Sequence, residues 1–84
     1  GPVFVGKWKD NIPTGEGSAV DCNGNLLYTG GWKDGRRHGM GTEYSPSGTT
    51  VFIGLWEDNR RVRGILYQNG VPTPYPPEPM ASKA

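Results

Sequence analysis

The sequence has little of what most folded domains depend on. Its one cysteine, Cys22, excludes an internal disulfide framework and is typical of a reducing compartment. Only 15 of the 84 residues are Val, Ile, Leu or Phe, which would indicate disorder if the net charge were high. The net charge is only +1, which also argues against a dedicated nucleic-acid binder. No apolar run approaches the roughly 18 residues of a membrane-spanning helix, and no signal-peptide pattern opens the chain.

Glycine and proline are abundant instead, with 14 and 8 residues, and the glycines recur at a fixed interval. An interval of 24 residues relates three units to one another, which predicts a repeat protein. The residues in this register are Phe4, Tyr28 and Phe52; Gly6, Gly30 and Gly54; Trp8, Trp32 and Trp56; and Asp10, Asp34 and Asp58. Gly15-x-Gly17 likewise recurs as Gly39-x-Gly41.

Each unit has the pattern of a β-hairpin. The aromatic residue, the glycine and the tryptophan alternate with other residues, so they share one face of a strand. Asp34-Gly35 is a strong type I′ turn signal, and Asp10-Asn11 and Asp58-Asn59 are tolerable equivalents. Glycine is costly within a strand, so its regular use implies close packing, with the Gly-x-Gly pairs leaving a channel for the neighbouring tryptophan. No segment shows helical spacing with caps.

These residues resemble the MORN repeat (membrane occupation and recognition nexus), whose pattern is roughly Tyr-x-Gly-x-Trp-x-x-Gly-x-x-x-Gly-x-Gly. The second unit matches throughout, and the first has Asn11 at the turn. The third keeps Phe52, Gly54 and Trp56, but Arg63 stands where the first glycine of the pair belongs and one residue is missing before Gly64. The resemblance implies an all-β fold, a linear array of stacked antiparallel β-hairpins with an extended Pro-rich C-terminal tail.

The degenerate third unit is typical of the end of an array, since terminal repeats are usually atypical. Gly1-Pro2 matches the residues left when a purification tag is removed by a protease. The tail holds five prolines, which predicts an extended cap or linker without a helix. The predicted segments are the array entry (1–3), MORN repeat 1 (4–27), MORN repeat 2 (28–51), a degenerate terminal repeat (52–70) and the Pro-rich tail (71–84).

The sequence offers no catalytic constellation, and we expect neither enzymatic activity nor a cofactor. His38 is the only histidine and is expected in an exposed hairpin turn, with Cys22 at the opposite edge of the sheet. The two cannot form a nucleophile and base pair within one chain. Two chains could supply two Cys and two His for a tetrahedral metal site, but nothing in the sequence demands it and no metal is expected.

Two arginine pairs occupy equivalent positions, four and five residues after a tryptophan. They are Arg36-Arg37 and Arg60-Arg61, and stacking should place them roughly 10 Å apart on one edge. Such a ladder could hold an anionic ligand such as a lipid headgroup. Asp34 and Asp58 share those turns, however, so a solvated, self-neutralised edge fits the sequence better.

The aromatic ladder has two interpretations. Its rings can simply be the core, because so small a chain cannot spare them all for a ligand. The resemblance implies instead an aromatic-lined groove that grips a helix of a partner protein. The groove residues expected from this are Tyr28, Trp32, Phe52 and Trp56.

The last repeat predicts self-association. Its other face carries an apolar stripe that is expected to be a symmetric dimer interface, and the strand at 64–68 is expected to be a free, uncharged edge. The stripe consists of Val51, Ile53, Leu55, Ile65 and Tyr67. In a competing account, the tail folds back over the stripe within one chain.

Together these features predict a non-catalytic protein-protein interaction and self-association module at the end of a MORN-repeat scaffold. We expect it in the cytoplasm, next to the cytoskeleton or a membrane, as a homodimer with a helical or cytoskeletal protein partner, weak anionic membrane contact and no nucleic acid. Two alternatives are an anionic phospholipid (phosphoinositide) binding module and the accessory repeat region of a larger enzyme.

Overall fold

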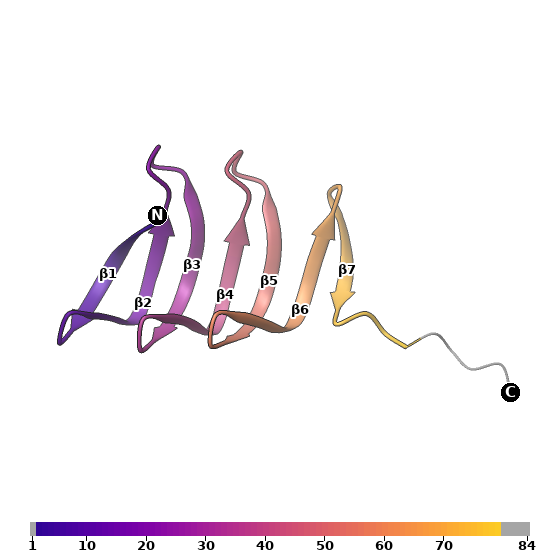
Figure 1. The fold of residues 1–84 in the computed structure, drawn as a ribbon. Helices are drawn as coiled ribbons and strands as arrows, with labels where there is room; N and C mark the ends of the chain where they lie inside the picture. Colours follow the sequence, from indigo (N-terminus) through magenta and orange to yellow (C-terminus); the bar gives the residue numbers. More distant parts are fainter. Residues whose placement is uncertain (1, 80–84) are drawn as a thin grey trace, which may run out of the picture.

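The computed structural model describes residues 2–79, and these form one open antiparallel sheet without helices (Figure 1). The seven strands lie side by side in sequence order. Their bounds are β1 Val3–Lys9, β2 Ile12–Val20, β3 Leu26–Lys33, β4 Arg36–Tyr44, β5 Thr50–Glu57, β6 Arg60–Gln68 and β7 Val71–Tyr75. The radius of gyration, 14.6 Å, exceeds the roughly 12 Å of a compact chain of this length. The all-β array of stacked hairpins is therefore confirmed, and it is elongated.

Two-residue turns join the strands within each hairpin. Asp34 and Gly35 both have positive φ angles, 53° and 78°, as a type I′ turn requires. Asp10-Asn11, Asp58-Asn59 and Asn69-Gly70 have the same pair of positive angles, so the predicted turns are confirmed. The three turns of the repeats line up along one edge of the sheet, at the bottom of Figure 1.

Longer turns connect one repeat to the next at the opposite edge. In the first, the Asp21 carboxylate accepts hydrogen bonds from the backbone N–H groups of Asn25 (2.8 Å) and Asn23 (2.9 Å). These bonds, that from Asn25 foremost, hold the pKa of Asp21 below its ordinary value. Ser45 occupies the same place in the second turn, where its hydroxyl contacts those of Ser47 and Thr49 and accepts the backbone N–H of Thr49 (3.3 Å). Both turns thus use a short polar side chain to bond their own backbone.

The aromatic side chains form one continuous row across the sheet. Each ring meets the next edge-to-face, with centroids 4.8–5.6 Å apart, a geometry that aromatic pairs prefer. The order of the row is Trp8, Phe4, Trp32, Tyr28, Trp56, Phe52 and Tyr75. Each tryptophan of repeats 2 and 3 therefore packs between the Phe or Tyr of its own repeat and that of the repeat before.

The glycines of the Gly-x-Gly pair serve two different purposes. A Cβ on Gly41 would overlap the Tyr28 ring, which lies flat over that position. A Cβ on Gly39 would meet nothing, but its φ of 79° is in the left-handed region that other residues avoid. The prediction that the glycine pair leaves a channel for the neighbouring tryptophan is therefore wrong. The ring over the glycine belongs to the same repeat, and the neighbouring Trp56 donates its indole N–H to the Gly41 carbonyl (3.2 Å) instead.

The missing residue of the third unit explains its missing glycine. In repeat 2, three residues of β4 stand between the partners of Trp32 and Gly30, and Gly39 is the middle one. In repeat 3 only two residues stand there, and Arg63 pairs directly with Leu55. Arg63 needs no positive φ and has none. The sequence degeneracy is thus a shorter bulge in an otherwise equivalent hairpin.

The chain does not leave the sheet after the third unit. Residues 71–75 of the predicted tail form β7, which pairs along β6 from Gln68↔Val71 to Gly64↔Tyr75. The prediction that residues 64–68 are a free edge is wrong, because β7 covers it. The asparagine-glycine turn at 69–70 reverses the chain and makes this pairing possible. Residues 80–84 of the predicted tail lie outside the described residues.

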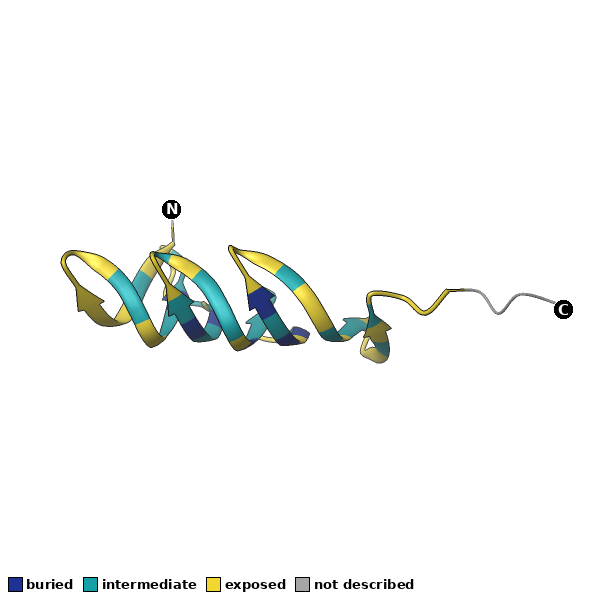
Figure 2. Ribbon diagram, turned by 90° about the horizontal axis from the view of Figure 1, so that it is seen from below, coloured by how far each residue is buried: buried dark blue, intermediate teal, exposed yellow. Residues whose placement is uncertain are grey.

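The tryptophans become more buried from the first repeat to the third. Trp8 is 56% exposed, Trp32 is half-buried and Trp56 is only 2% exposed. The buried core consists of Ala19, Tyr28, Phe52 and Trp56, and no residue of β1 belongs to it. Figure 2 shows the buried segments in the middle of the array, in β2 to β5. A tryptophan of this fold is thus buried only when another repeat precedes it.

Candidate functional site

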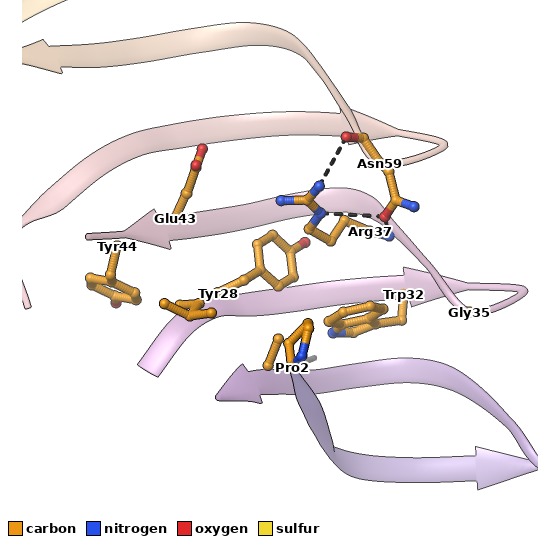
Figure 3. A pocket seen from close by; sticks show the side chains of 10 residues that line it. Pro2, Tyr28, Trp32, Gly35, Arg37, Glu43, Tyr44 and Asn59 are labelled. Atoms are coloured by element: carbon orange, nitrogen blue, oxygen red, sulfur yellow. Dashed lines mark hydrogen bonds between the residues drawn. The ribbon is translucent and has the colours of Figure 1, made fainter. Parts of the chain in front are cut away.

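A groove of about 430 Å³ opens on the aromatic face beside the central repeat (Figure 3). Tyr28 and Trp32 lie in its floor, and Arg37 and Glu43 supply one charge of each sign. The register places these side chains together, because Tyr28 is the cross-strand partner of Glu43 and Trp32 that of Arg37. The remaining lining residues are Pro2, Ala19, Leu27, Gly35, Tyr44 and Asn59.

Arg37 is fixed at the wall of the groove by hydrogen bonds with Asn59 of the next repeat. Its guanidinium donates to the side-chain oxygen (3.3 Å) and the carbonyl (3.2 Å) of Asn59, and the Asn59 side chain also accepts the Arg37 backbone N–H at 2.8 Å. The guanidinium carbon lies 4.6 Å from the centroid of the Trp56 ring, a cation–π distance. Arg37 therefore covers Trp56 and links two repeats, which explains why that tryptophan is buried.

Two of the four predicted groove residues line this groove, and two do not. Tyr28 and Trp32 do so, although only the edge of Tyr28 is accessible. Phe52 and Trp56 are 0% and 2% exposed and lie under Arg61 and Arg37. The arginines at the fifth position after Trp32 and Trp56 decide this, because Arg37 lies over Trp56 and Arg61 lies over Phe52. Sequence reasoning missed Glu43, Tyr44 and Asn59, because these residue types do not recur at the equivalent position of every repeat.

Tyr28 carries the strongest electrostatic perturbation of the site. Burial raises the pKa of its phenol to about 12, partly opposed by the charge of Arg37. Its hydroxyl donates a hydrogen bond to the Gly31 carbonyl at 2.9 Å. The groove floor therefore stays neutral at physiological pH, and the charges lie at the walls.

The four predicted anion-binding arginines do not form a single ladder. Arg37 and Arg61 point to the aromatic face, where Arg61 forms a 2.7 Å ion pair with Glu43. By strand alternation Arg36 and Arg60 belong to the reverse face. There Arg36 lies 3.7 Å from Asp58, and Glu57 lines the same depression as Arg60. Arg36 and Arg61 thus each have a carboxylate partner, whereas Arg37 bonds Asn59.

The reverse face of the last repeats is apolar and partly exposed. Ile53 and Ile65 are cross-strand partners and each is 40% exposed, while Leu55 and Tyr67 are half-buried. The prediction that Val51 shares this face is wrong. The register slips by one residue between Glu43↔Phe52 and Tyr44↔Thr50, and Val51 packs against the aromatic core instead. The other four residues of the stripe, Ile53, Leu55, Ile65 and Tyr67, lie on the reverse face.

Neither Cys22 nor His38 is part of a site within the chain. Cys22 is exposed in the turn between β2 and β3. The prediction that His38 is an exposed turn residue is wrong, because the turn takes only two residues and His38 lies half-buried in β4. Its Nδ1 is buried without a hydrogen-bond partner among residues 2–79. In this same range no three His, Cys, Asp or Glu side chains gather in a group that could hold a metal ion.

The family model of the MORN repeat matches the sequence twice, at residues 4–26 and 28–50. Together these matches cover more than half of the chain, which therefore belongs to the MORN repeat family. MORN repeats are generally protein- or membrane-interaction modules and are generally non-catalytic. No curated protein matches the sequence. Within the described part of the chain, no helix is long and apolar enough to cross a membrane.

Proposed function

We propose that this chain is a non-catalytic protein-binding and self-association module of a scaffold. The observation that carries the proposal is the open groove over Tyr28 and Trp32. Apolar surface with a few oriented polar groups is the usual composition of a recognition site. Arg37 and Glu43, both on β4, provide those polar groups, and Asn59 and Arg61 already hold them in place.

The groove suits a short apolar segment flanked by charges, such as one face of an amphipathic helix. Leu27 extends the floor beyond the rings. The arginine and the glutamate can each bond a residue of opposite charge on the incoming segment. Because both side chains are held by the protein's own contacts, binding would require little rearrangement.

A library of amphipathic helical peptides displayed on phage tests this proposal. Peptides selected on the 84-residue chain should shift the backbone amide resonances of the groove residues in NMR spectra. Leu27→Glu, in the groove, should weaken the selected peptides at least tenfold, since it places a charge in apolar surface. Met40→Glu is the matched control, because Met40 is 64% exposed on the reverse face. Equal effects of the two substitutions, or resonance shifts centred on the reverse face, would contradict the proposed site.

Self-association is the second part of the proposal. The exposed pair Ile53 and Ile65 supports an interface on the reverse face. The prediction of an interface at the C-terminal repeat also relied on a free edge of β6. That reason no longer holds, because β7 covers this edge.

A further inference from the structure

One turn of the sheet differs from those of repeats 2 and 3 in the contacts of its central peptide group. Asn69-Gly70 joins β6 to β7 at the edge opposite the turns of the repeats (Figure 1). In repeat 2 the backbone N–H of the second turn residue, Gly35, donates to the Pro13 carbonyl of repeat 1 (3.1 Å), and Asn59 of repeat 3 donates to repeat 2 in the same way (3.1 Å). The Gly70 N–H has no such acceptor among residues 2–79, so no hydrogen bond restrains the peptide group between Asn69 and Gly70.

Asparagine followed by glycine occurs at one other place in the sequence, Asn23-Gly24 in the turn between β2 and β3. There the Gly24 N–H donates to the Asp21 carbonyl (3.0 Å), and the Asp21 carboxylate accepts the Asn23 N–H (2.9 Å). At Gly70 a Cβ would meet nothing, so packing does not replace the missing hydrogen bond. The chain thus holds the same dipeptide twice, once fixed by its own turn and once free to rotate.

We propose that Asn69 is a site of spontaneous deamidation, which forms isoaspartate and thereby loosens β7. The Gly70 backbone nitrogen, after losing its proton to hydroxide, attacks the side-chain carbonyl carbon of Asn69. Ammonia leaves as the new C–N bond closes a five-membered succinimide ring. Water then opens the ring, at the former backbone carbonyl to give isoaspartate or at the side-chain carbonyl to give aspartate. The net reaction consumes one water and releases one ammonia.

The turn needs a single rotation to bring the reacting atoms together. The first residue of a type I′ turn has a ψ of about +30°, which directs the next backbone nitrogen away from its side chain, whereas a ψ of about −120° in a type II′ turn brings the two together. The φ of this residue is positive in both types, and Asn69 already has a φ of 53°. Rotation of one peptide group therefore converts one hairpin turn into the other. Gly70 permits this because glycine adopts both signs of φ.

The same rotation is more costly at Asn23-Gly24. It would break the hydrogen bond from Gly24 to the Asp21 carbonyl and strain the turn that the Asp21 carboxylate holds. The loss of one such hydrogen bond corresponds to roughly a tenfold lower population of the rotated turn. In the folded protein, Asn69 should therefore react about tenfold faster than Asn23, although each is followed by a glycine that leaves the attacking nitrogen unhindered.

Isoaspartate at position 69 would disturb a turn that consists of only two residues. It adds one carbon to the backbone between Gln68 and Val71, whose pairing begins the β6–β7 ladder. Pro72 and Pro74 provide no backbone N–H, so β7 has few ladder bonds to hold it once the turn no longer fits. Deamidation should thus uncover the outer edge of β6 and separate the Tyr75 ring from the aromatic row.

Incubation of the 84-residue chain in mildly alkaline buffer tests the proposal, with mass spectrometry of its proteolytic peptides at successive times. We expect Asn69 to be converted about tenfold faster than Asn23, with isoaspartate as a product. In concentrated urea, where neither turn is formed, the two residues should react at similar rates. This comparison separates the effect of the turn from that of the sequence, because both pairs have the same chemistry.

Hydrogen exchange followed by NMR measures the consequence for β7. The β6 amides that bond β7 should lose protection in step with the formation of isoaspartate. Asn69→Gly is the matched control, since glycine tolerates the positive φ and cannot deamidate, and it should keep this protection through the same incubation. Freshly prepared Asn69→Asp should also keep it, because it adds the charge without the extra backbone carbon.

Two results would overturn the inference, each at a different step. Equal rates at Asn69 and Asn23 in the folded chain would show that the free peptide group does not select the site. Isoaspartate at position 69 with unchanged protection of β6 would show that the two-residue turn does not hold β7 in place. The phage-display test of the groove does not depend on either result.

Discussion

Tyr75 stacks edge-to-face on Phe52, with ring centroids 5.6 Å apart and planes at 84°, although it belongs to no repeat. The neighbouring pairs Phe4–Trp32 and Tyr28–Trp56 show that this position normally belongs to the tryptophan of a following repeat. A single tyrosine on a short strand thus replaces a whole hairpin. The Tyr75 ring thereby keeps Phe52 completely buried at the end of the row.

Removing the Tyr75 ring should therefore destabilise the protein. We expect Tyr75→Ala to lower the free energy of unfolding by about 2 kcal/mol, from lost burial and the lost aromatic pair. Tyr75→Phe keeps the ring and should change it by less than about 0.5 kcal/mol. Urea denaturation measures both. Val71→Ala on the same strand is the control, and an equal loss there would show that strand pairing, not the ring, closes the array.

The repeat predicted the architecture because its register encodes the stack directly. An aromatic residue, a glycine and a tryptophan recur every 24 residues, and a turn signal follows each set. Few other folds fit this pattern. Tyr75 could not be found in the same way, because it lies outside that register in a proline-rich stretch. Prolines suggested a departing linker, whereas the Asn69-Gly70 turn brings them back as an edge strand.

The candidate site was only partly predictable, for two physical reasons. The 24-residue spacing predicts that Phe52 and Trp56 lie on the groove face. It does not predict that arginines cover them, because an arginine side chain is long enough to reach either face. The bulge before Phe52 turns Val51 to the aromatic side, and alternation across a bulge cannot be counted from sequence.

The two glycines of repeat 2 should respond differently to substitution. Gly39→Ala strains a left-handed backbone and should cost about 1–2 kcal/mol of unfolding free energy, with Gly39→Asn milder because asparagine tolerates that conformation. Gly41→Ala forces the Tyr28 ring to move and should cost about 3 kcal/mol, with Gly41→Asn worse still. Thermal and urea unfolding of the four variants measure the order. Asparagine that is milder than alanine at both positions would refute the assignment of two causes.

Membrane binding should be weak and electrostatic. Arg36, Arg60 and Arg63 are exposed on the reverse face, and Asp58 and Glu57 lie beside the first two. Each net charge near an anionic surface contributes about 1 kcal/mol, and salt screens it. Co-sedimentation with vesicles containing phosphoinositides should thus retain little protein at physiological salt. Strong, headgroup-specific retention that disappears in Arg36→Glu/Arg60→Glu would instead establish the lipid-binding alternative.

Arg37 should matter for stability far more than its neighbours in sequence. We expect Arg37→Met to lower the free energy of unfolding by about 1–2 kcal/mol, because it removes both the bonds to Asn59 and the contact with Trp56. Arg37→Lys should recover less than half of this, since a lysine cannot reproduce the flat, multiple contact. Arg60→Met is the control and should change stability by less than about 0.5 kcal/mol. Similar losses at both positions would mean that Arg37 is not a link between repeats.

Alkaline pH should destabilise the protein through Tyr28. Burial raises the pKa of Tyr28 to about 12 in the folded protein, whereas an unfolded tyrosine ionises near its ordinary value of 10.0. Between these two values the unfolded chain releases the phenolic proton and the folded chain keeps it. The unfolded state therefore binds fewer protons, so the free energy of unfolding must fall as pH rises through this window.

The contribution of Tyr28 is fully present below pH 10 and is lost by about pH 12, at most about 2–3 kcal/mol in all. Other groups also titrate there, so the informative quantity is the difference between wild type and Tyr28→Phe. Phenylalanine cannot ionise, and it also lacks the hydrogen bond to Gly31, so Tyr28→Phe should be the less stable protein at pH 8. Its disadvantage should shrink or reverse near pH 11.5. Parallel pH dependences of the two proteins, measured by urea unfolding between pH 8 and 11.5, would show that the Tyr28 phenol is not held neutral by burial.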